Sequence, residues 1–252
     1  MTETDSPPDN AQSTPRKPFL LRVAGVFIEP GETFEDIASN PDWIAPLVLL
    51  ILFSLAVSET MLARIGMSRI IMHSLEMSGR AANMSTAQLS HAVSAGAAVG
   101  AIFVQGIAVI AVPVFLLIVA GFGLLILNGF FGQKARFKQV FSVTCYADMP
   151  AILGCIMAIA VMFFADPDAF NPQSPAPTNL GYFLNPQTTS HALMAVANSL
   201  DFIIVWFMIL LAMGLSRVAQ RKVKTGSIFG ICAGVWVLVI LAKVGFAMLT
   251  GG

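Results

Sequence analysis

The sequence has little charge. Asp, Glu, Lys and Arg make up 11% of its 252 residues, whereas an ordinary soluble domain carries about 25%. Hydrophobic residues make up 56% and form long uninterrupted runs. A helix of about 20 apolar residues crosses the hydrocarbon core of a bilayer, which is roughly 30 Å thick. The shortage of charge therefore excludes an ordinary water-soluble domain and predicts an all-α polytopic transmembrane bundle.

Chemically reactive patterns are also missing. Cys145, Cys155 and Cys232 lie in or beside apolar runs without a Cys-x-x-Cys spacing, and we interpret them as small buried apolar side chains. There is no Walker loop, no His-Glu-x-x-His and no Gly-x-Ser-x-Gly. His73 and Glu76 would share a helix face, but no second pair of ligands accompanies them. With a formal net charge of zero as well, we predict no catalytic residue, no metal site, no cofactor and no nucleic-acid partner.

The apolar runs divide the chain. Residues 1–18 are polar, rich in proline and without the apolar core of a signal peptide, so they predict a disordered cytoplasmic tail. Residues 19–42 predict an amphipathic segment at the membrane interface, and residues 43–249 a membrane domain of five helices. The predicted spans are 43–62, 99–127, 143–165, 202–216 and 227–249.

The positions of Lys and Arg predict the orientation. The low-polarity stretch from residue 92 to 131 is nearly long enough for two crossings. One long helix there places ten of the 14 Lys and Arg on the side of the N-terminus and only three on the other side. Short cytoplasmic loops are enriched in these residues. We therefore predict one helix, kinked at Pro113, with the N-terminus in the cytoplasm and the C-terminus in the periplasm.

A charged helical segment precedes the first span. Pro30 suits the first turn of a helix, and Thr33 with Asp36 resembles a capping box. Phe34 would lie on the apolar face, while Trp43 suits an interfacial anchor. The acidic side chains could pair with a basic cluster predicted on the same side of the membrane, although two separately solvated patches remain the alternative. The predicted interaction surface comprises Glu32, Phe34, Glu35, Asp36, Arg217, Arg221, Lys222 and Lys224.

Asp148 is the sharpest candidate for chemistry, because an ionisable group inside a span is costly to insert. It could cap the helix that Pro150 starts, bind a proton or cation, or lie exposed at the interface. Asp201 and Glu59 lie at the outer ends of their spans. For Asp201 we favour a helix cap, and Glu59 could pair with Arg64.

The remaining predictions concern helix surfaces. Residues 63–91 alternate apolar and polar side chains and predict an amphipathic helix on the outer surface. Lys243 should extend its long side chain outward. Small residues at a spacing of four let helices approach closely in lipid, and they could serve either packing within the bundle, which we favour, or a dimer interface. They are Gly96 with Gly100, and Gly226, Gly230 and Gly234.

Three stretches in register resemble the bacterial branch of the Yip family (Ypt-interacting proteins). They are "EPGETFEDIASNPDWIAPL", "FKQVFSVTCYADMP" and "LDFIIVWFMILLAMGLS". The resemblance runs from about Val26 to the end and implies a five-span membrane protein. It singles out structural positions that do not include Asp148. They are Pro30, Phe34, Trp43, Pro46, Phe137, Tyr146, Pro150, Asp201, Trp206 and Gly214.

The resemblance implies a role in general terms only. Eukaryotic members bind Rab-type GTPases and assist membrane traffic, whereas bacterial relatives are inner-membrane proteins without that partner system. We therefore expect a non-enzymatic organising or protein-interaction factor of the bacterial inner membrane. Its expected partners are the lipid bilayer and an unidentified protein, and a second copy of the chain is a further candidate. A small transporter or channel, proton-coupled through Asp148, is the alternative.

Overall fold

The computed structural model describes residues 17–77, 79–164, 166, 170–171, 174–185 and 188–250. Over these residues the chain forms helices and loops, with one isolated bridge between Asn179 and Asp201 and no strand. The predicted all-α class is therefore confirmed. The elements are α1 (Phe19–Ile28), α2 (Pro30–Ser39), α3 (Ile44–Arg64), α4 (Met67–Met77), η1 (Ala81–Asn83), α5 (Thr86–Leu124), η2 (Leu125–Phe130), α6 (Phe137–Ala147), α7 (Pro150–Phe164), η3 (Leu180–Phe183), α8 (His191–Ser199), α9 (Phe202–Val218) and α10 (Thr225–Thr250).

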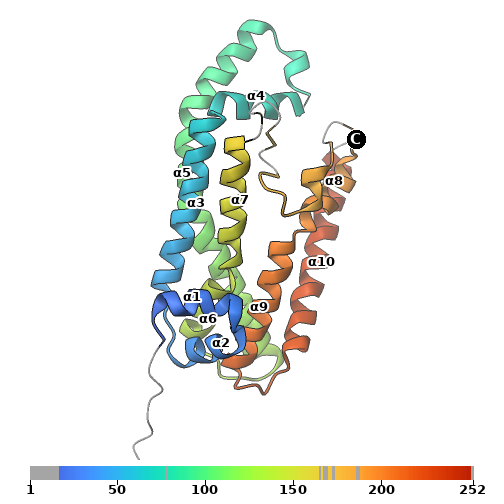
Figure 1. Cartoon of the computed structure of the whole chain (residues 1–252). Helices are drawn as coiled ribbons and strands as arrows, with labels where there is room; N and C mark the ends of the chain where they lie inside the picture. Colours follow the sequence, from blue (N-terminus) through green and yellow to red (C-terminus); the bar gives the residue numbers. More distant parts are fainter. Residues whose placement is uncertain are drawn as a thin grey trace, which may run out of the picture.

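Four helical segments of the described chain are long and apolar enough to cross a membrane. They are Ile44–Arg64, Thr86–Phe130, Phe137–Phe164 and Thr225–Leu249. They coincide with the predicted spans 43–62, 99–127, 143–165 and 227–249, except that residue 165 lies outside the described part. Figure 1 shows these helices side by side along one long axis. Their length and composition are those of transmembrane helices.

The other predicted span, 202–216, forms the shorter helix α9. It has 17 residues, which corresponds to a length of about 26 Å at 1.5 Å per residue. Its side chains are mostly buried against α2, α6 and α10. Sequence correctly predicted a helix here, but its length alone does not establish a fifth crossing.

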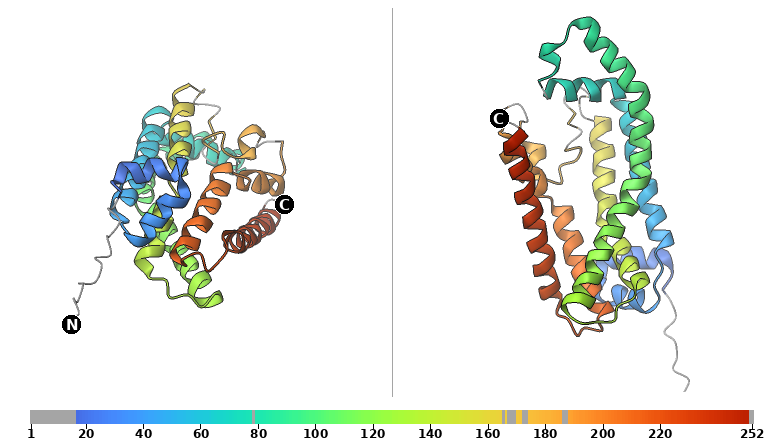
Figure 2. Two further views of the ribbon diagram at one scale, coloured as in Figure 1. Left: turned by 60° about the horizontal axis from the view of Figure 1, so that its bottom comes forward. Right: turned by 180° about the vertical axis from the view of Figure 1, so that it is seen from behind.

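The stretch from residue 86 to 130 is one continuous helix, as predicted. A capping box starts it, in which the backbone N–H of Gln88 donates to Ser85 Oγ and the backbone N–H of Ser85 donates to Gln88 Oε1. Pro113 lies inside α5. The helix extends past its neighbours at the end that carries α4, as Figure 1 and the right-hand view of Figure 2 show.

Small residues play two different parts. A side-chain carbon at Gly96 or Gly100 would crowd Ile71 or Met67 of α4, so these glycines let the predicted amphipathic helix α4 pack on α5. Along α10 the prediction of packing within the bundle is wrong. At Gly226, Gly230 and Gly234 a side-chain carbon would meet no atom of another described segment within 4 Å. The helix packs on α8 and α9 through its other faces.

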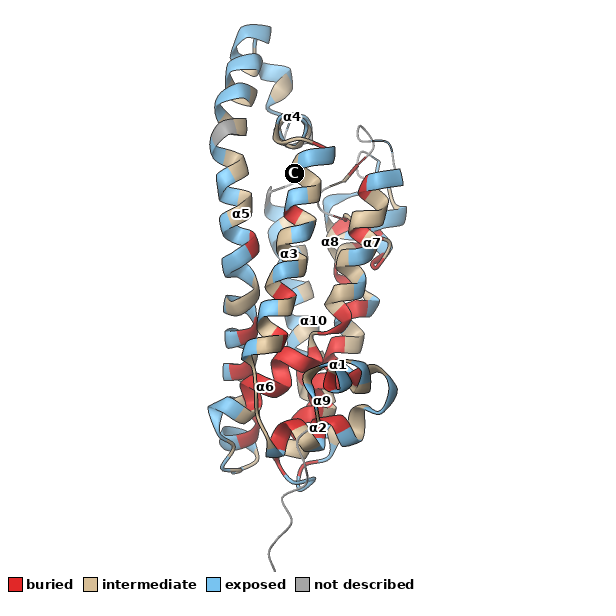
Figure 3. Ribbon diagram, turned by 60° about the vertical axis from the view of Figure 1, so that its left-hand side comes forward, coloured by how far each residue is buried: buried red, intermediate tan, exposed pale blue. Residues whose placement is uncertain are grey.

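Buried residues gather at the end of the bundle where α1 and α2 lie. Figure 3 shows buried positions concentrated on α2, α6, α9 and the lower part of α5, while the far part of α5 is largely exposed. The main core contains Phe34, Leu116, Tyr146 and Leu215 from four of these helices. We call this part of the molecule the α1–α2 end, and it holds the candidate site.

Candidate functional site at the α1–α2 end

Phe34 anchors α2 to the bundle. Its side chain is fully buried, and its ring packs against α9 at Gly214. A side-chain carbon at Gly214 would lie 2.9 Å from Phe34 Cδ1 and would also collide with Val143 of α6. The glycine therefore makes the space that the ring occupies, which explains why both residues belong to the pattern of the resemblance.

A buried arginine ties α1 to the elements that follow it. The side chain of Arg22 is 0% exposed. Its Nε donates to Asp36 Oδ2 of α2 at 2.7 Å, and its Nη1 donates to the backbone oxygen of Asn40 at 3.0 Å and to Asp42 Oδ2 at 3.3 Å. The hydroxyl of Tyr146 in α6 donates to Asp42 Oδ1 at 3.4 Å. We call these four side chains, Arg22, Asp36, Asp42 and Tyr146, the Arg22 network.

The charges of the Arg22 network stabilise one another. Burial on its own lowers the pKa of Arg22. The hydrogen bond to Asp36 and the negative charge of Asp36 raise it by more than burial lowers it, so the pKa lies above the ordinary value for arginine. Arg22 is therefore a permanent cation. Its Nη2 is buried without a hydrogen-bond partner among the described residues. Two of the three guanidinium nitrogens of Arg22, Nε and Nη1, therefore have partners in the described chain.

Sequence reasoning missed this network. It predicted a capping box between Thr33 and Asp36, which is wrong because α2 begins earlier, at Pro30. Asp36 consequently lies in the second turn, where it reaches Arg22, and Thr33 is buried against Gly25 of α1. The signal that could have been used is a lone arginine inside the apolar run "FLLRVAGVF", which a membrane-adjacent helix tolerates only with a partner.

The predicted interaction surface is divided by burial. Phe34 is buried and the side chain of Asp36 is only 11% exposed, so both residues hold α2 in place from beneath. The side chains of Glu32 and Glu35 are 77% and 56% exposed. They form the outward face of α2, where Lys17 Nζ lies 3.8 Å from Glu32 Oε2.

The basic cluster consists of Arg217, Arg221, Lys222 and Lys224. In the described chain it reaches α2 through an ion pair between Arg221 and Glu35. Arg221 Nη2 donates to Glu35 Oε2 at 2.8 Å. Gln220 and Arg221 both have positive φ, at 52° and 61°, which is uncommon for residues other than glycine. The resulting turn is held by Ser216, whose hydroxyl donates to the backbone oxygen of Val223 at 2.7 Å. Arg217 lies beneath α2 beside Gly31, while Lys222 and Lys224 are exposed.

Aromatic contacts hold most of the remaining pattern residues at this end. The ring centroids of Trp43 and Phe141 lie 5.5 Å apart, and Phe137 stacks on Phe141 at 5.4 Å. Trp206 meets Phe27 of α1 edge-on at 5.5 Å. Pro46 and Pro150 are buried near the start of α3 and at the start of α7.

Asp148 lies where α6 ends and α7 has not yet begun. The backbone N–H groups of Ala151 and Ile152 donate to the carbonyl oxygens of Asp148 and Met149, so the start of α7 is satisfied by backbone. Within the described chain the Asp148 carboxylate has no hydrogen bond or salt bridge of its own, and it is half-buried. It therefore does not act as the cap of α7 that we considered.

Residues at the opposite end serve structural roles. Asp201 caps α9, as predicted, because its Oδ1 accepts from the backbone N–H of Ile203 at 2.8 Å. Glu59 bonds to Gln105 rather than Arg64, whose guanidinium lies over the ring of Phe163. Lys243 donates to Ser199 of α8 instead of extending outward. Among the described residues no three His, Cys, Asp or Glu side chains gather as metal ligands would.

A comparison with family models bears on these contacts. The model described as Yip1 domain matches residues 24–246, which is most of the chain. This chain belongs to the Yip1 family. No curated protein and no solved structure matches it. In this Yip1 chain, five residues of the family resemblance lie in or against the core of the α1–α2 end, whereas Asp201 lies at the opposite end. The five are Phe34, Trp43, Tyr146, Trp206 and Gly214.

Proposed function

We propose that this Yip1-family chain is a non-enzymatic organising or protein-interaction factor of the bacterial inner membrane. In this proposal α9 crosses the bilayer as a fifth span, the α1–α2 end faces the cytoplasm and the C-terminus faces the periplasm. The uneven placement of Lys and Arg supports the orientation. The length of α9, about 26 Å, approaches the thickness of the hydrocarbon core.

One observation carries the proposal, namely the ion pair between Arg221 and Glu35. It joins the outward face of α2 to the loop after α9, two segments that lie far apart in the sequence. The exposed charges of both segments then form one surface on the buried, rigid support of Phe34 and Arg22. Exposed charges gathered on one surface can steer a protein partner of complementary charge and fix its orientation. We call Glu32, Glu35, Arg221, Lys222 and Lys224 the charged surface.

A double substitution, Glu32→Lys with Glu35→Lys, tests this role. Photocrosslinking from α2 in native membranes should recover a defined protein partner with the natural chain, and the double variant should lose most of it. Glu76→Lys, which makes the same charge reversal once, at an exposed position of α4, is the control for charge reversal elsewhere and should retain the partner. Asp36 is left unchanged because it holds Arg22. Unaltered partner recovery by the folded double variant would contradict the proposal.

The small-residue stripe of α10 supports a second copy of the chain as a further partner. Gly226, Gly230 and Gly234 are uncovered within the described chain, and such stripes let two helices approach closely in lipid. Gly230→Leu should then shift the mass of the complex, measured in native nanodiscs, toward a single chain. A mass unaffected by this change would remove α10 as the contact.

Transport remains a second candidate because of the position of Asp148. Asp148 lies at the break between α6 and α7, and no described side chain hydrogen-bonds to its carboxylate. Carboxylates at helix breaks are typical of ion pathways in membranes. Under this alternative, Asp148→Asn should abolish the flux of protons into proteoliposomes, while the variant protein remains folded. Equal flux for both proteins would rule out Asp148 as the coupling group.

A further inference from the structure

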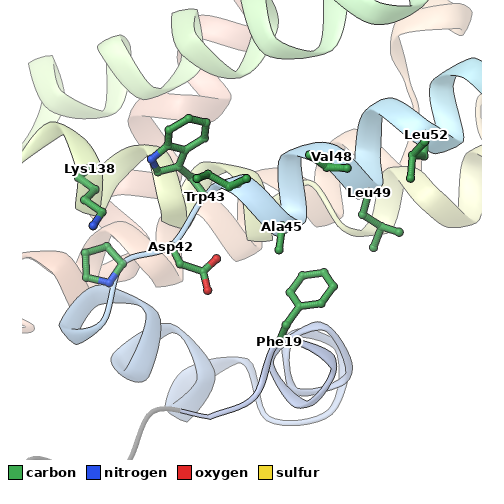
Figure 4. Close-up of a pocket in the computed structure, with 10 residues that line it drawn as sticks. Phe19, Asp42, Trp43, Ala45, Val48, Leu49, Leu52 and Lys138 are labelled. Carbon is green, nitrogen blue, oxygen red and sulfur yellow. The ribbon is translucent and has the colours of Figure 1, made fainter.

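A pocket of about 700 Å³ opens beside the start of α3. It lies between the first turn of α1, the turn that leads from α2 into α3, and the first turn of α6. Its lining includes Phe19, Asp42, Trp43, Ala45, Val48 and Lys138. Figure 4 shows Lys138 and Asp42 at one end and the side chains of α3 extending away from them. The pocket therefore has a charged end and an apolar end.

The charged end offers a free cation. Lys138 is exposed, and within the described chain its ammonium forms no ion pair or hydrogen bond. The nearby Asp42 is already engaged by Arg22 and Tyr146. The Arg22 network and Lys138 together carry two positive charges and two carboxylates, so an anion at Lys138 meets little net repulsion. A phosphate group suits an exposed ammonium at this position.

The apolar end is continuous with the membrane-facing side of α3. Val48 and Leu52 lie one turn apart and are 48% and 56% exposed, and both line the pocket. They belong to a candidate transmembrane helix, so the medium next to them is hydrocarbon. Trp43, between the two ends, has the character of a residue at the headgroup level. One pocket thus spans headgroup and acyl-chain depth.

We propose that this pocket binds one phospholipid of the leaflet that adjoins the α1–α2 end. Its phosphate pairs with Lys138, and an acyl chain lies along Val48 and Leu52 against Phe19. A soluble anion would leave the apolar end unused, and a purely apolar ligand would leave Lys138 without a counter-charge. An amphiphile with a phosphate matches both ends. This inference goes beyond the proposed function, since it does not depend on any protein partner or on transport.

Native mass spectrometry of the detergent-purified full chain tests the phosphate contact. The probes are phosphatidylethanolamine, phosphatidylglycerol and a diacylglycerol with the same acyl chains. The natural chain should bind one phospholipid about tenfold more tightly than the diacylglycerol, and Lys138→Gln should remove this difference. Lys138→Arg, which keeps the charge, should preserve it. Lys134 is an exposed lysine of the preceding loop and does not line the pocket. Lys134→Gln is therefore the matched control and should bind phospholipid as the natural chain does.

The apolar end is tested by filling it. Ala45 lines the pocket and its side chain points toward Phe19 (Figure 4), so Ala45→Phe should occupy the acyl-chain position and weaken phospholipid binding about tenfold. The thermal unfolding midpoint of the Ala45→Phe variant shows whether it is folded. If it is not, Val48→Ser replaces it, since a polar side chain at the apolar end should also weaken phospholipid binding. Equal phospholipid binding by the natural chain and Lys138→Gln would overturn the proposal. So would equal affinity for diacylglycerol, or displacement of the lipid by millimolar inorganic phosphate.

Discussion

Arg22 shows what a single buried charge does at the α1–α2 end. One of its three hydrogen bonds reaches α2 and two reach the turn between α2 and α3, so one side chain joins α1 to the two segments that follow it. Removal of one partner from a buried ion pair is far more costly than the pair is stabilising, because the remaining charge is left without compensation. The network therefore makes the arrangement of these segments specific.

This reasoning gives a residue-scale prediction. Arg22→Met should lower the free energy of unfolding by about 3 kcal/mol, because it removes the cation that faces two largely buried carboxylates, Asp36 and Asp42. Unfolding in detergent, followed by circular dichroism, provides the measurement. Arg221→Met is the control: it removes the exposed ion pair with Glu35 instead of the two buried pairs of Arg22, and should change stability by less than about 1 kcal/mol. Equal losses for the two variants would contradict a special role for burial.

The same residues mark the limit of sequence reasoning. Pro30 as a first-turn residue and the apolar face of Phe34 could be predicted, because both follow from local rules. The partner of Asp36 could not, because it lies 14 residues earlier on another helix. A carboxylate near a helix start looks the same in sequence whether it caps the helix or pairs with a distant arginine.

At the scale of elements, spacing predicted where small residues would occur but not what they would face. Gly96 with Gly100 and the stripe from Gly226 to Gly234 have the same four-residue spacing, yet among the described residues the first pair packs against another helix and the stripe does not. The helices themselves were predictable, since runs of apolar residues are long enough to fix α3, α5 and α10. Which helix neighbours which is a property of the folded bundle that no run of residues encodes locally.

Two glycine substitutions test the distinction between packed and open helix faces. Gly214→Ala should destabilise the protein by about 1–3 kcal/mol, since the new methyl group collides with Val143 and Phe34. Gly230→Ala, on the open face of α10, should be neutral or slightly stabilising because alanine favours helix. Thermal unfolding of both variants in one detergent gives the comparison. If Gly214→Ala is as stable as Gly230→Ala, the described packing of Phe34 is incorrect.

At the scale of the whole molecule, the number of crossings decides where the termini lie. Five spans place the two termini on opposite sides of the membrane, whereas four would place them on the same side. With Cys145, Cys155 and Cys232 replaced by alanine, Lys222→Cys and Thr189→Cys flank α9 and can be labelled by an impermeant maleimide. We expect Thr189→Cys to react in cells with a permeabilised outer membrane, and Lys222→Cys only after the inner membrane is opened. Labelling of both positions under the same condition would show that α9 does not cross.

The contact between Phe34 and Gly214 also has a consequence for biosynthesis. The Arg22 network can form most of its bonds as soon as residue 42 has been made, because Arg22, Asp36 and Asp42 are close in the sequence. Phe34 must wait for a glycine that is translated 180 residues later. Until α9 has been made and has packed on α2, a nascent chain leaves the aromatic side chain of Phe34 without the helix that covers it. Chaperones and proteases that recognise exposed aromatic groups can therefore distinguish an unfinished chain from a completed one.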